Sequence, residues 1–341
     1  MPEALIVGLD DYVTSLRWSP QGDYLAALPA LGGILVLTAD GEVCARLPCH
    51  LGGNGAAVWH PRDPILATYG QDGLVRIYQL PNPEPLHTWS TGPGWAERAE
   101  WNSDGTLLAV AVGKAVRILE GSTGAERQVI SGHKSTVSDL AWNPCRPDEL
   151  VTVCDGGAKI WRIGQLAPSG QFDWGGASLY VGWSPDGRWF ATGDQTPSVH
   201  LYDTFAHSPL HIHGFDSKVK ALAWQHDGTW LAVSGGAGVT RWPCMGKNGP
   251  EGANPVELTG HTRDVLALDF LPGGAYLASG AKDGKVLLWR PHSDTDSVVV
   301  AQRAHPVTAL RWSPDGRALA FGTAAGELTI FRLKQNLPPS R

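Results

Sequence analysis

The sequence offers little that would favour nucleic acid or a membrane as its partner. It contains 27 lysine and arginine residues against 33 aspartate and glutamate residues, a formal net charge of −6, and no run rich in basic residues. This charge balance argues against nucleic acid and anionic membrane surfaces. No apolar run is long enough to span a bilayer, because Pro29, Gly32 and Gly33 interrupt the stretch 26–39. We therefore expect neither nucleic acid nor membrane among the partners.

Cysteine is scarce, and its number is odd. The five cysteines, at positions 44, 49, 145, 154 and 244, lack the spacing of a disulfide framework. The N-terminal segment carries Glu3, Asp10 and Asp11 around a short apolar stretch, which is unlike a secretory signal peptide. These features predict reduced thiols in a cytoplasmic protein.

Motifs of catalysis are also missing. The chain has no phosphate-binding glycine loop, no nucleophile elbow and no zinc-protease pair of histidines, so we expect no enzyme activity and no cofactor. Two groups of residues have side chains that bind soft metals, but zinc needs four ligands and neither group supplies them. We favour structural roles for both and leave metal binding open; the groups are Cys44, Cys49 and His50, and His207, His211 and His213.

Tryptophan, by contrast, recurs at nearly constant spacing. The intervals between the aromatic anchors are 41, 42, 41, 41, 41, 46 and 42 residues. A period of about 40 to 45 residues is typical of a β-propeller, in which each repeat is a four-stranded sheet that stacks on its neighbours. Eight copies therefore predict eight blades in a single domain over residues 1–341. The anchors are Trp18, Trp59, Trp101, Trp142, Trp183, Trp224, Phe270 and Trp312.

Each repeat has the same internal order. An alternating strand, such as residues 13–18, precedes the anchor, and a turn such as Ser-Pro-Asp-Gly at 184–187 follows it. A small apolar strand comes next, then a strand that ends in a large residue, and then a more polar fourth strand. Residues 4–8 form an apolar strand with no partner before it, while the last repeat, 305–333, lacks its fourth strand. We therefore expect residues 4–8 to pair with that repeat and close the ring, which removes an exposed sheet edge.

The repeats resemble the WD40 family of β-propellers over the whole chain. The most specific match is repeat seven, with Gly260 before its histidine and Gly284 after its aspartate. In that family a histidine, a serine or threonine, an aspartate and a tryptophan form a hydrogen-bonded tetrad, which satisfies buried polar groups. Repeat two has Thr68, Asp72 and Tyr78 without an evident histidine. The resemblance implies two full tetrads: His261, Ser279, Asp283 and Trp289, and His133, Thr152, Asp155 and Trp161.

The resemblance implies a non-catalytic scaffold or adaptor that binds other proteins or peptides and is a monomer on its own. One alternative is a receptor for a small molecule or peptide at the central channel. A second is an enzyme similar to the eight-bladed quinone-dependent dehydrogenases. Residues 121–124 of this chain superficially resemble the repeat of those enzymes. The absence of an export signal and of an acidic metal cluster argues against that enzyme.

Geometry indicates where a partner would bind. In a propeller, the loops that lead into the first strands and those between second and third strands emerge on one face, around the channel mouth. Large aromatic and charged residues there have no packing duty and are typical interface anchors, although Trp95 and Trp174 could instead cover their own loops. This candidate face comprises Tyr12, Trp95, Arg98, Trp174, Tyr180, Lys218, Lys220, Arg263, Asp264 and Lys282.

Overall fold

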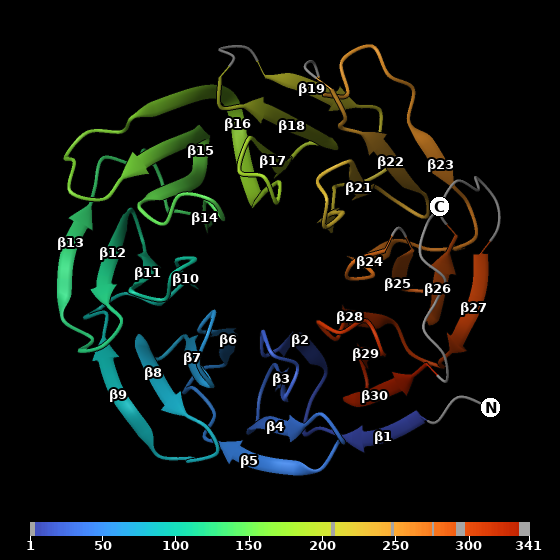
Figure 1. Cartoon of the computed structure of the whole chain (residues 1–341), viewed down its shortest axis with the longest axis horizontal. Coiled ribbons are helices and arrows are strands. Elements are labelled where there is room, and N and C mark those ends of the chain that lie inside the picture. The colour runs from blue at the N-terminus through green and yellow to red at the C-terminus, as the bar shows by residue number, and fades with distance from the viewer. Residues whose placement is uncertain (1–3, 206–208, 247–248, 275, 291–296, 334–341) are drawn as a thin grey trace.

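The computed structural model describes residues 4–205, 209–246, 249–274, 276–290 and 297–333. These residues form strands arranged in a closed ring, and none of them is helical (Figure 1). Seven antiparallel sheets follow one another around the ring, six with four strands and one with six. The all-β propeller that the sequence predicts is therefore confirmed.

In five of the seven sheets, four strands follow one another in chain order from the channel to the rim; the six-stranded sheet and the sheet that contains β1 differ. The first three sheets comprise β2 (Val13–Trp18), β3 (Tyr24–Pro29), β4 (Ile34–Thr38) and β5 (Val43–Leu47); β6 (Asn54–Trp59), β7 (Ile65–Gly70), β8 (Leu74–Gln79) and β9 (Pro85–Ser90); and β10 (Arg98–Trp101), β11 (Leu107–Val112), β12 (Ala115–Glu120) and β13 (Glu126–Ile130). The six-stranded sheet comprises β14 (Asp139–Trp142), β15 (Glu149–Arg162), β16 (Gly170–Trp183), β17 (Trp189–Asp194), β18 (Ser198–Asp203) and β19 (Leu210–His213). The last three comprise β20 (Leu222–Trp224), β21 (Trp230–Ser234), β22 (Val239–Pro243) and β23 (Val256–Leu258); β24 (Val265–Phe270), β25 (Leu277–Ala281), β26 (Lys285–Trp289) and β27 (Ser297–Gln302); and β28 (Val307–Trp312), β29 (Ala318–Thr323), β30 (Glu327–Arg332) and β1 (Ala4–Gly8).

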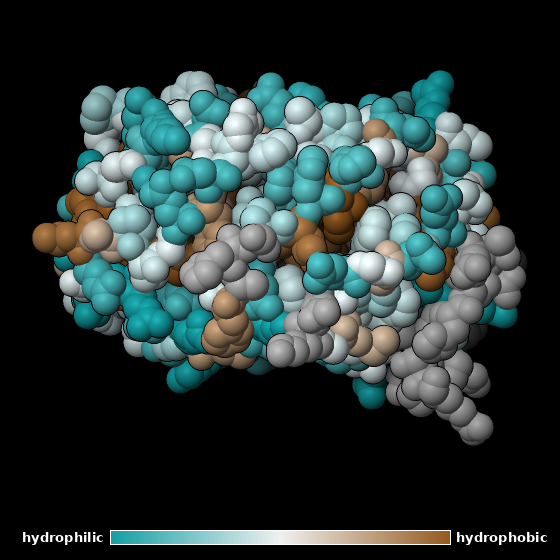
Figure 2. Space-filling view, turned by 90° about the horizontal axis from the view of Figure 1, so that it is seen from above, coloured by the Kyte–Doolittle hydropathy of each residue, from teal (hydrophilic) through white to brown (hydrophobic). Residues whose placement is uncertain are grey.

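Burial follows the position of a strand in its sheet. Second strands such as β17 and β29 are buried at every residue, because neighbouring sheets cover both of their faces. The outer strand β9 is mostly exposed and alternates with partly buried positions. The side of the ring seen in Figure 2 is largely hydrophilic, with separate apolar patches. Small apolar residues therefore occupy the middle of each sheet, and polar residues occupy the rim.

The prediction of eight blades is not what the structure shows, because its described residues form seven sheets. Repeats four and five share one six-stranded sheet because β16 stays extended from Gly170 to Trp183. Its first part pairs with β15 in a register from Ile160↔Gly170 to Asp155↔Ala177, and its second part pairs with β17 from Ser178↔Asp194 to Trp183↔Phe190. No loop separates the two repeats at this point, so their hydrogen bonds run through a common strand.

The strand β15 folds back on itself. Trp161 donates its indole N–H to the Thr152 hydroxyl at 2.9 Å, whereas nine extended residues would span about 30 Å. Gly156 and Gly157 lie between the two and have φ of 97° and 111°. Two successive residues with positive φ are what a tight hairpin turn of type I′ requires, and glycine adopts them without a steric penalty. β15 therefore contributes two antiparallel arms.

The ring is closed by the first strand of the chain. β1 pairs antiparallel with β30, in a register from Ala4↔Phe331 to Gly8↔Glu327, so residues 4–8 are the outer strand of the last sheet. On the channel side, the Thr308 hydroxyl donates to the Val13 carbonyl at 2.5 Å, which joins β28 to β2. Backbone pairing at the rim and contacts at the channel therefore both hold the two ends of the ring together.

The periodic tryptophans link neighbouring repeats. Five of them donate the indole N–H to the backbone carbonyl of the residue that precedes the anchor of the repeat before. Since these partners lie one repeat apart, the bond accounts for the 41- to 42-residue spacing in physical terms. The bonds are Trp59 to Arg17 at 2.9 Å, Trp142 to Glu100 at 2.9 Å, Trp183 to Ala141 at 3.0 Å, Trp224 to Gly182 at 3.1 Å and, across the closure, Trp18 to Arg311 at 3.4 Å.

The part of the chain that the structure describes contains no helix with the length and hydropathy that a membrane crossing needs.

Candidate interaction face and central channel

Two aromatic residues of the candidate face stand free of packing. Tyr12 precedes β2 and is 46% exposed, and Trp95 precedes β10 and is 55% exposed. Both lie in loops that lead into first strands, as the sequence predicts. Exposed rings of this size are what an interface anchor needs, because their apolar area remains to be buried by a partner.

Trp174 has a different environment from the one expected. It lies in β16, and its ring packs against His200 at 4.1 Å and His211 at 5.3 Å between ring centroids. These histidines belong to β18 and β19, the two outer strands of the shared sheet. Trp174 therefore covers its own sheet, and it does not join Tyr12 and Trp95 as a free anchor.

The remaining members of the candidate face divide into two groups. Arg98, Tyr180 and Lys220 line the central channel. Lys218 and Arg263 are exposed, while Lys282 is held by Asp264 in an ion pair of 2.7 Å. Surface pairs of this kind contribute little free energy because solvent screens them. Among the described residues, the side chains without a polar partner on the outer part of the face are those of Tyr12, Trp95, Lys218 and Arg263.

Repeat seven forms the hydrogen bonds of the full tetrad. The Ser279 hydroxyl lies 2.8 Å from His261 Nε2 and accepts the Trp289 indole N–H at 2.8 Å. Both Asp283 carboxylate oxygens lie 3.2 Å from His261 Nδ1. Burial lowers the pKa of His261 against the opposing effect of Asp283, while hydrogen bonds and His261 lower the pKa of Asp283 despite its burial. A buried chain of donors and acceptors is thereby satisfied.

Repeat four has only three of the four members. His133 Nε2 accepts from the Thr152 hydroxyl at 2.9 Å, and Trp161 donates to the same oxygen. His133 Nδ1 donates to the Lys114 carbonyl at 3.0 Å, and Asp155 is exposed. The assignment of Asp155 to this tetrad is therefore wrong, because the hairpin turn at Gly156 and Gly157 directs the acid away from His133.

His50 supplies the histidine that repeat two was thought to lack. Its Nε2 lies 2.9 Å from the Thr68 hydroxyl, and its Nδ1 lies 2.7 Å from Asp72. The sequence separations, 18 and 22 residues, equal those between His261, Ser279 and Asp283 in repeat seven. Spacing alone could have identified it. Arg76 also pairs with Asp72 at 2.8 Å.

This role separates His50 from the suggested group with Cys44 and Cys49. In the second suggested group, His211 and His213 have ring centroids 5.2 Å apart, and His207 lies outside the described residues. Across the residues that the structure describes, no three histidine, cysteine or acidic side chains are placed to hold a metal ion.

The central channel has a volume of about 740 Å³ and a wall that includes residues from all seven sheets. Because side chains alternate along a strand, two positions of each first strand point the same way: the residue before the anchor and the residue three before it. Charged residues occupy several of them. Arg98 was already expected on the candidate face, as was Lys220, which lies just before β20. The other charged wall residues were missed from the sequence, although the alternation could have revealed them. The charged wall residues are Arg17, Arg98, Glu100, Asp139, Lys220 and Arg311.

The acidic groups of the wall are strongly perturbed. Burial, together with the Asp139 carboxylate, raises the pKa of Glu100 to about 8. Burial also raises the pKa of Asp139, against the effect of Arg98, whose Nε lies 3.3 Å from the Asp139 carboxylate. Asp269 is not among the wall residues, but it interacts with Arg311 and burial raises its pKa as well. Glu100 is therefore largely protonated at neutral pH, while the arginines stay charged.

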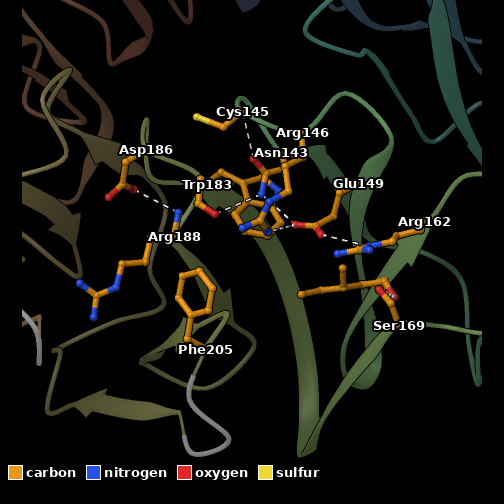
Figure 3. Close-up of polar contacts among 12 residues, drawn as sticks. Asn143, Cys145, Arg146, Glu149, Arg162, Ser169, Trp183, Asp186, Arg188 and Phe205 are labelled. Atoms are coloured by element: carbon orange, nitrogen blue, oxygen red, sulfur yellow. Dashed lines mark hydrogen bonds and ion pairs between the residues drawn. The ribbon is translucent and has the colours of Figure 1, made fainter.

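The opposite face, which carries the turns after the anchors, presents another exposed aromatic residue. Phe205 is 74% exposed, and the Arg146 guanidinium lies 6.0 Å from its ring centroid. Beside it, Glu149 accepts from Asn143 and Arg146 and pairs with Arg162, as Figure 3 shows. Gly246 lies near this face too, because Arg188 donates to its carbonyl at 3.0 Å.

Comparison with known proteins identifies the repeat. The family model "WD domain, G-beta repeat" matches residues 124–162, 177–203, 207–240 and 253–290. The chain is 28% identical over 199 residues to THO complex subunit 3 of Arabidopsis thaliana, covering 55% of this chain and 61% of that protein. It is 22% identical over 237 residues to the WD repeat-containing protein AAC3 of Dictyostelium discoideum, covering 69% and 45%.

A further relative is eukaryotic translation initiation factor 3 subunit I of Pyricularia oryzae, which is 27% identical over 242 residues and covers 69% of this chain and 61% of its own length. The chain thus spans less than two thirds of the length of each of these relatives. None of the three names denotes an enzyme. The four repeat matches and the ring of sheets show WD40 repeats in this chain and support the WD40-repeat family of β-propeller proteins.

Proposed function

We propose that this protein is a non-catalytic scaffold that binds another protein or a peptide through the face that carries Tyr12 and Trp95. The observation that carries the proposal is the exposure of Trp95, 55%, in a loop where the fold does not require a large ring. Two of the relatives are named as subunits, of the THO complex and of a translation initiation factor. Their names support a role of this chain in a protein assembly.

The shared sheet bears on the number of blades. We propose that it acts as two blade equivalents, so that the ring counts eight structural repeats. The two arms of β15 and the two parts of β16 would give residues 139–213 eight strand segments, which is twice the number in the other sheets. Each half of the shared sheet also has its own anchor tryptophan, Trp142 in the first and Trp183 in the second.

The setting of the protein is proposed on similar grounds. All five cysteines are free of disulfides, which agrees with a reducing compartment such as the cytoplasm. We propose a single domain that is a monomer until it meets its partner. Size-exclusion chromatography with light scattering would report the monomer, and fractionation of the source cells would report the compartment.

The scaffold proposal is tested by capture from extracts of the source organism. Immobilised wild-type protein, Trp95→Ala and Phe205→Ala are compared, the last being a matched aromatic truncation on the opposite face. Loss of a true anchor costs about 2 kcal/mol of binding, roughly a thirtyfold decrease in affinity. We expect Trp95→Ala to lose the partner and Phe205→Ala to keep it. If Phe205→Ala loses the partner and Trp95→Ala keeps it, binding belongs to the opposite face. A variant with a shortened loop 243–254 should then also lose the partner.

The channel receptor remains the second candidate, because a charged cavity of about 740 Å³ runs through the ring. The quinone-dependent dehydrogenase has no comparable support, and purified protein without quinone absorption would exclude it.

A further inference from the structure

The central channel is of a size that suits a small ligand. Its volume of about 740 Å³ lies within the range of about 300–1,000 Å³ that is usual for small-molecule sites. Most of its wall comes from strands, including β2 and β28, so the side chains of Arg17 and Arg311 are held by regular backbone. A wall of this kind positions charged groups with little freedom to collapse onto one another.

Arg17 and Arg311 occupy equivalent positions in adjacent first strands of this wall. Each immediately precedes its anchor, and the Arg311 backbone carbonyl accepts the Trp18 indole N–H. Burial and the nearby Arg311 charge lower the pKa of Arg17 to about 10. The two cations therefore interact electrostatically across the closure of the ring, and both remain charged at neutral pH.

Neither arginine is neutralised by a direct ion pair among the described residues. Arg17 Nη1 donates to the Leu16 carbonyl, and Arg311 Nη1 donates to the carbonyls of Leu268 and Leu310. Their Nη2 groups form no hydrogen bond with any described residue, so donors remain available to a ligand. Two guanidinium groups on adjacent strands of one channel wall match an oxyanion, because each presents a planar fork of N–H donors.

The other groups of the channel do not cancel this charge. Arg98 pairs with Asp139, and Lys220 adds a further cation on the wall. Asp269 lies near Arg311, but it accepts the Trp312 backbone N–H at 2.7 Å and forms no ion pair among the described residues. Glu100 has its pKa raised to about 8 by burial, so most copies are neutral at pH 7. Cations therefore outnumber ionised carboxylates in the channel, although the chain as a whole has a net charge of −6.

We propose that the central channel binds a small organic anion whose carboxylate or phosphate group is held jointly by Arg17 and Arg311. This site is separate from the outer face that carries Trp95, and it does not rest on the scaffold function. An oxyanion there takes the free N–H donors and relieves the repulsion between the two guanidinium groups. Salt weakens the binding by screening the charges.

Isothermal titration calorimetry at low ionic strength tests the site, with succinate and inorganic phosphate as separate probes. Succinate reports a carboxylate and phosphate reports a phosphoryl group. We expect at least one of them to bind the wild type, and we expect Arg17→Met and Arg311→Met each to lower the affinity tenfold or more. Arg46→Met is the control, because Arg46 is exposed on the outer strand β5 and should bind like the wild type.

Folding of the variants is checked by circular dichroism, and Arg17→Lys provides a second substitution that keeps the charge but loses the fork. We expect Arg17→Lys to bind with intermediate affinity. In parallel, the bound probe should raise the melting temperature of the wild type above that in sodium chloride of equal ionic strength. Absence of binding and of any thermal shift overturns the proposal. Equal affinity of the wild type and the folded arginine variants also overturns it. A hexaglutamate peptide is a third probe, and the proposal is likewise overturned if this peptide binds while neither succinate nor phosphate does.

Discussion

Trp18 donates its indole N–H to the backbone carbonyl of Arg311, 293 residues further along the chain, at 3.4 Å. The same bond, from an anchor to the repeat before it, recurs at four other anchors around the ring. The bond therefore has two roles: it joins neighbouring repeats, and at Trp18 it joins the last repeat to the first. Arg311, which accepts this bond, also presents its charged side chain to the channel. The contact that closes the ring and the proposed anion site therefore share the backbone at Arg311.

The first prediction distinguishes the contribution of this hydrogen bond from that of the size of the indole side chain. Trp59→Phe removes the N–H that meets the Arg17 carbonyl at 2.9 Å, and the loss of a buried hydrogen bond costs about 1 kcal/mol. Trp101→Phe is the matched control, because the Trp101 indole N–H is buried without a partner among the described residues. We expect Trp59→Phe to lower the free energy of unfolding in urea by about 1 kcal/mol more than Trp101→Phe. Equal losses would mean that the bond contributes nothing.

The second prediction compares the acids of repeats seven and four. Asp283→Ala leaves the buried His261 N–H without its acceptor, which costs about 1–3 kcal/mol. Asp155→Ala should change stability by less than about 0.5 kcal/mol, because this exposed side chain has no tetrad partner. Thermal unfolding of both variants measures the difference. If Asp155→Ala were as damaging as Asp283→Ala, the three-membered arrangement of repeat four would be refuted.

A third prediction concerns closure at the rim. Deleting residues 1–8 removes β1 and exposes the edge of β30, whose unpaired N–H and C=O groups can pair with another chain. We expect a lower melting temperature and aggregation in light scattering. Deleting residues 1–3 alone keeps β1 and serves as the control. A monodisperse protein of unchanged stability after the longer deletion would show that the outer strand is dispensable.

The fourth prediction follows from the raised pKa of Glu100. Its folded value of about 8 exceeds its ordinary value of 4.5, so between these values the folded state binds a proton that the unfolded state has released. Stability therefore falls as pH rises through this window, and the penalty is constant above it. Glu100→Gln keeps an acceptor for the Trp142 backbone N–H, which Glu100 now accepts at 3.2 Å, but it carries no charge. Its melting temperature should exceed that of the wild type at pH 9 by more than at pH 5.

If the melting temperatures of the wild type and Glu100→Gln differed by the same amount from pH 5 to pH 9, the raised pKa of Glu100 would be contradicted. Burial also raises the pKa values of Asp139, which lines the channel, and of Asp269, so both aspartates make stability fall with rising pH as well. The comparison with Glu100→Gln isolates the contribution of Glu100, because both aspartates are present in each protein.

Several features of the site were within reach of the sequence. The tetrad of repeat seven follows from local spacing, and the same spacing of 18 and 22 residues could have revealed His50. Alternation along the first strands could likewise have placed Arg17 and Glu100 on the channel wall. These are short-range rules, since a strand has a period of two and a repeat has a nearly fixed length.

Other features depend on contacts that no local pattern encodes. Trp95 and Trp174 are similar in sequence context, yet only Trp174 meets His200 and His211, which lie on strands folded over from later in the chain. Asp155 was expected to bond to His133, but the hairpin of β15 turns it outward. The merging of two repeats into one sheet depends on β16 remaining extended through Trp174–Ala177, which its neighbours on both sides decide.

The sequence by itself determined the repeating β strands, the propeller ring and the pairing of its first strand with its last repeat, because hydrophobic alternation and repeat length act locally and are read in chain order. Only the tertiary structure decided which aromatic rings remain exposed, which charges gather in the channel and how far burial moves the pKa of Glu100. These properties arise from desolvation and from contacts between residues of different repeats, and both exist only after the ring has closed.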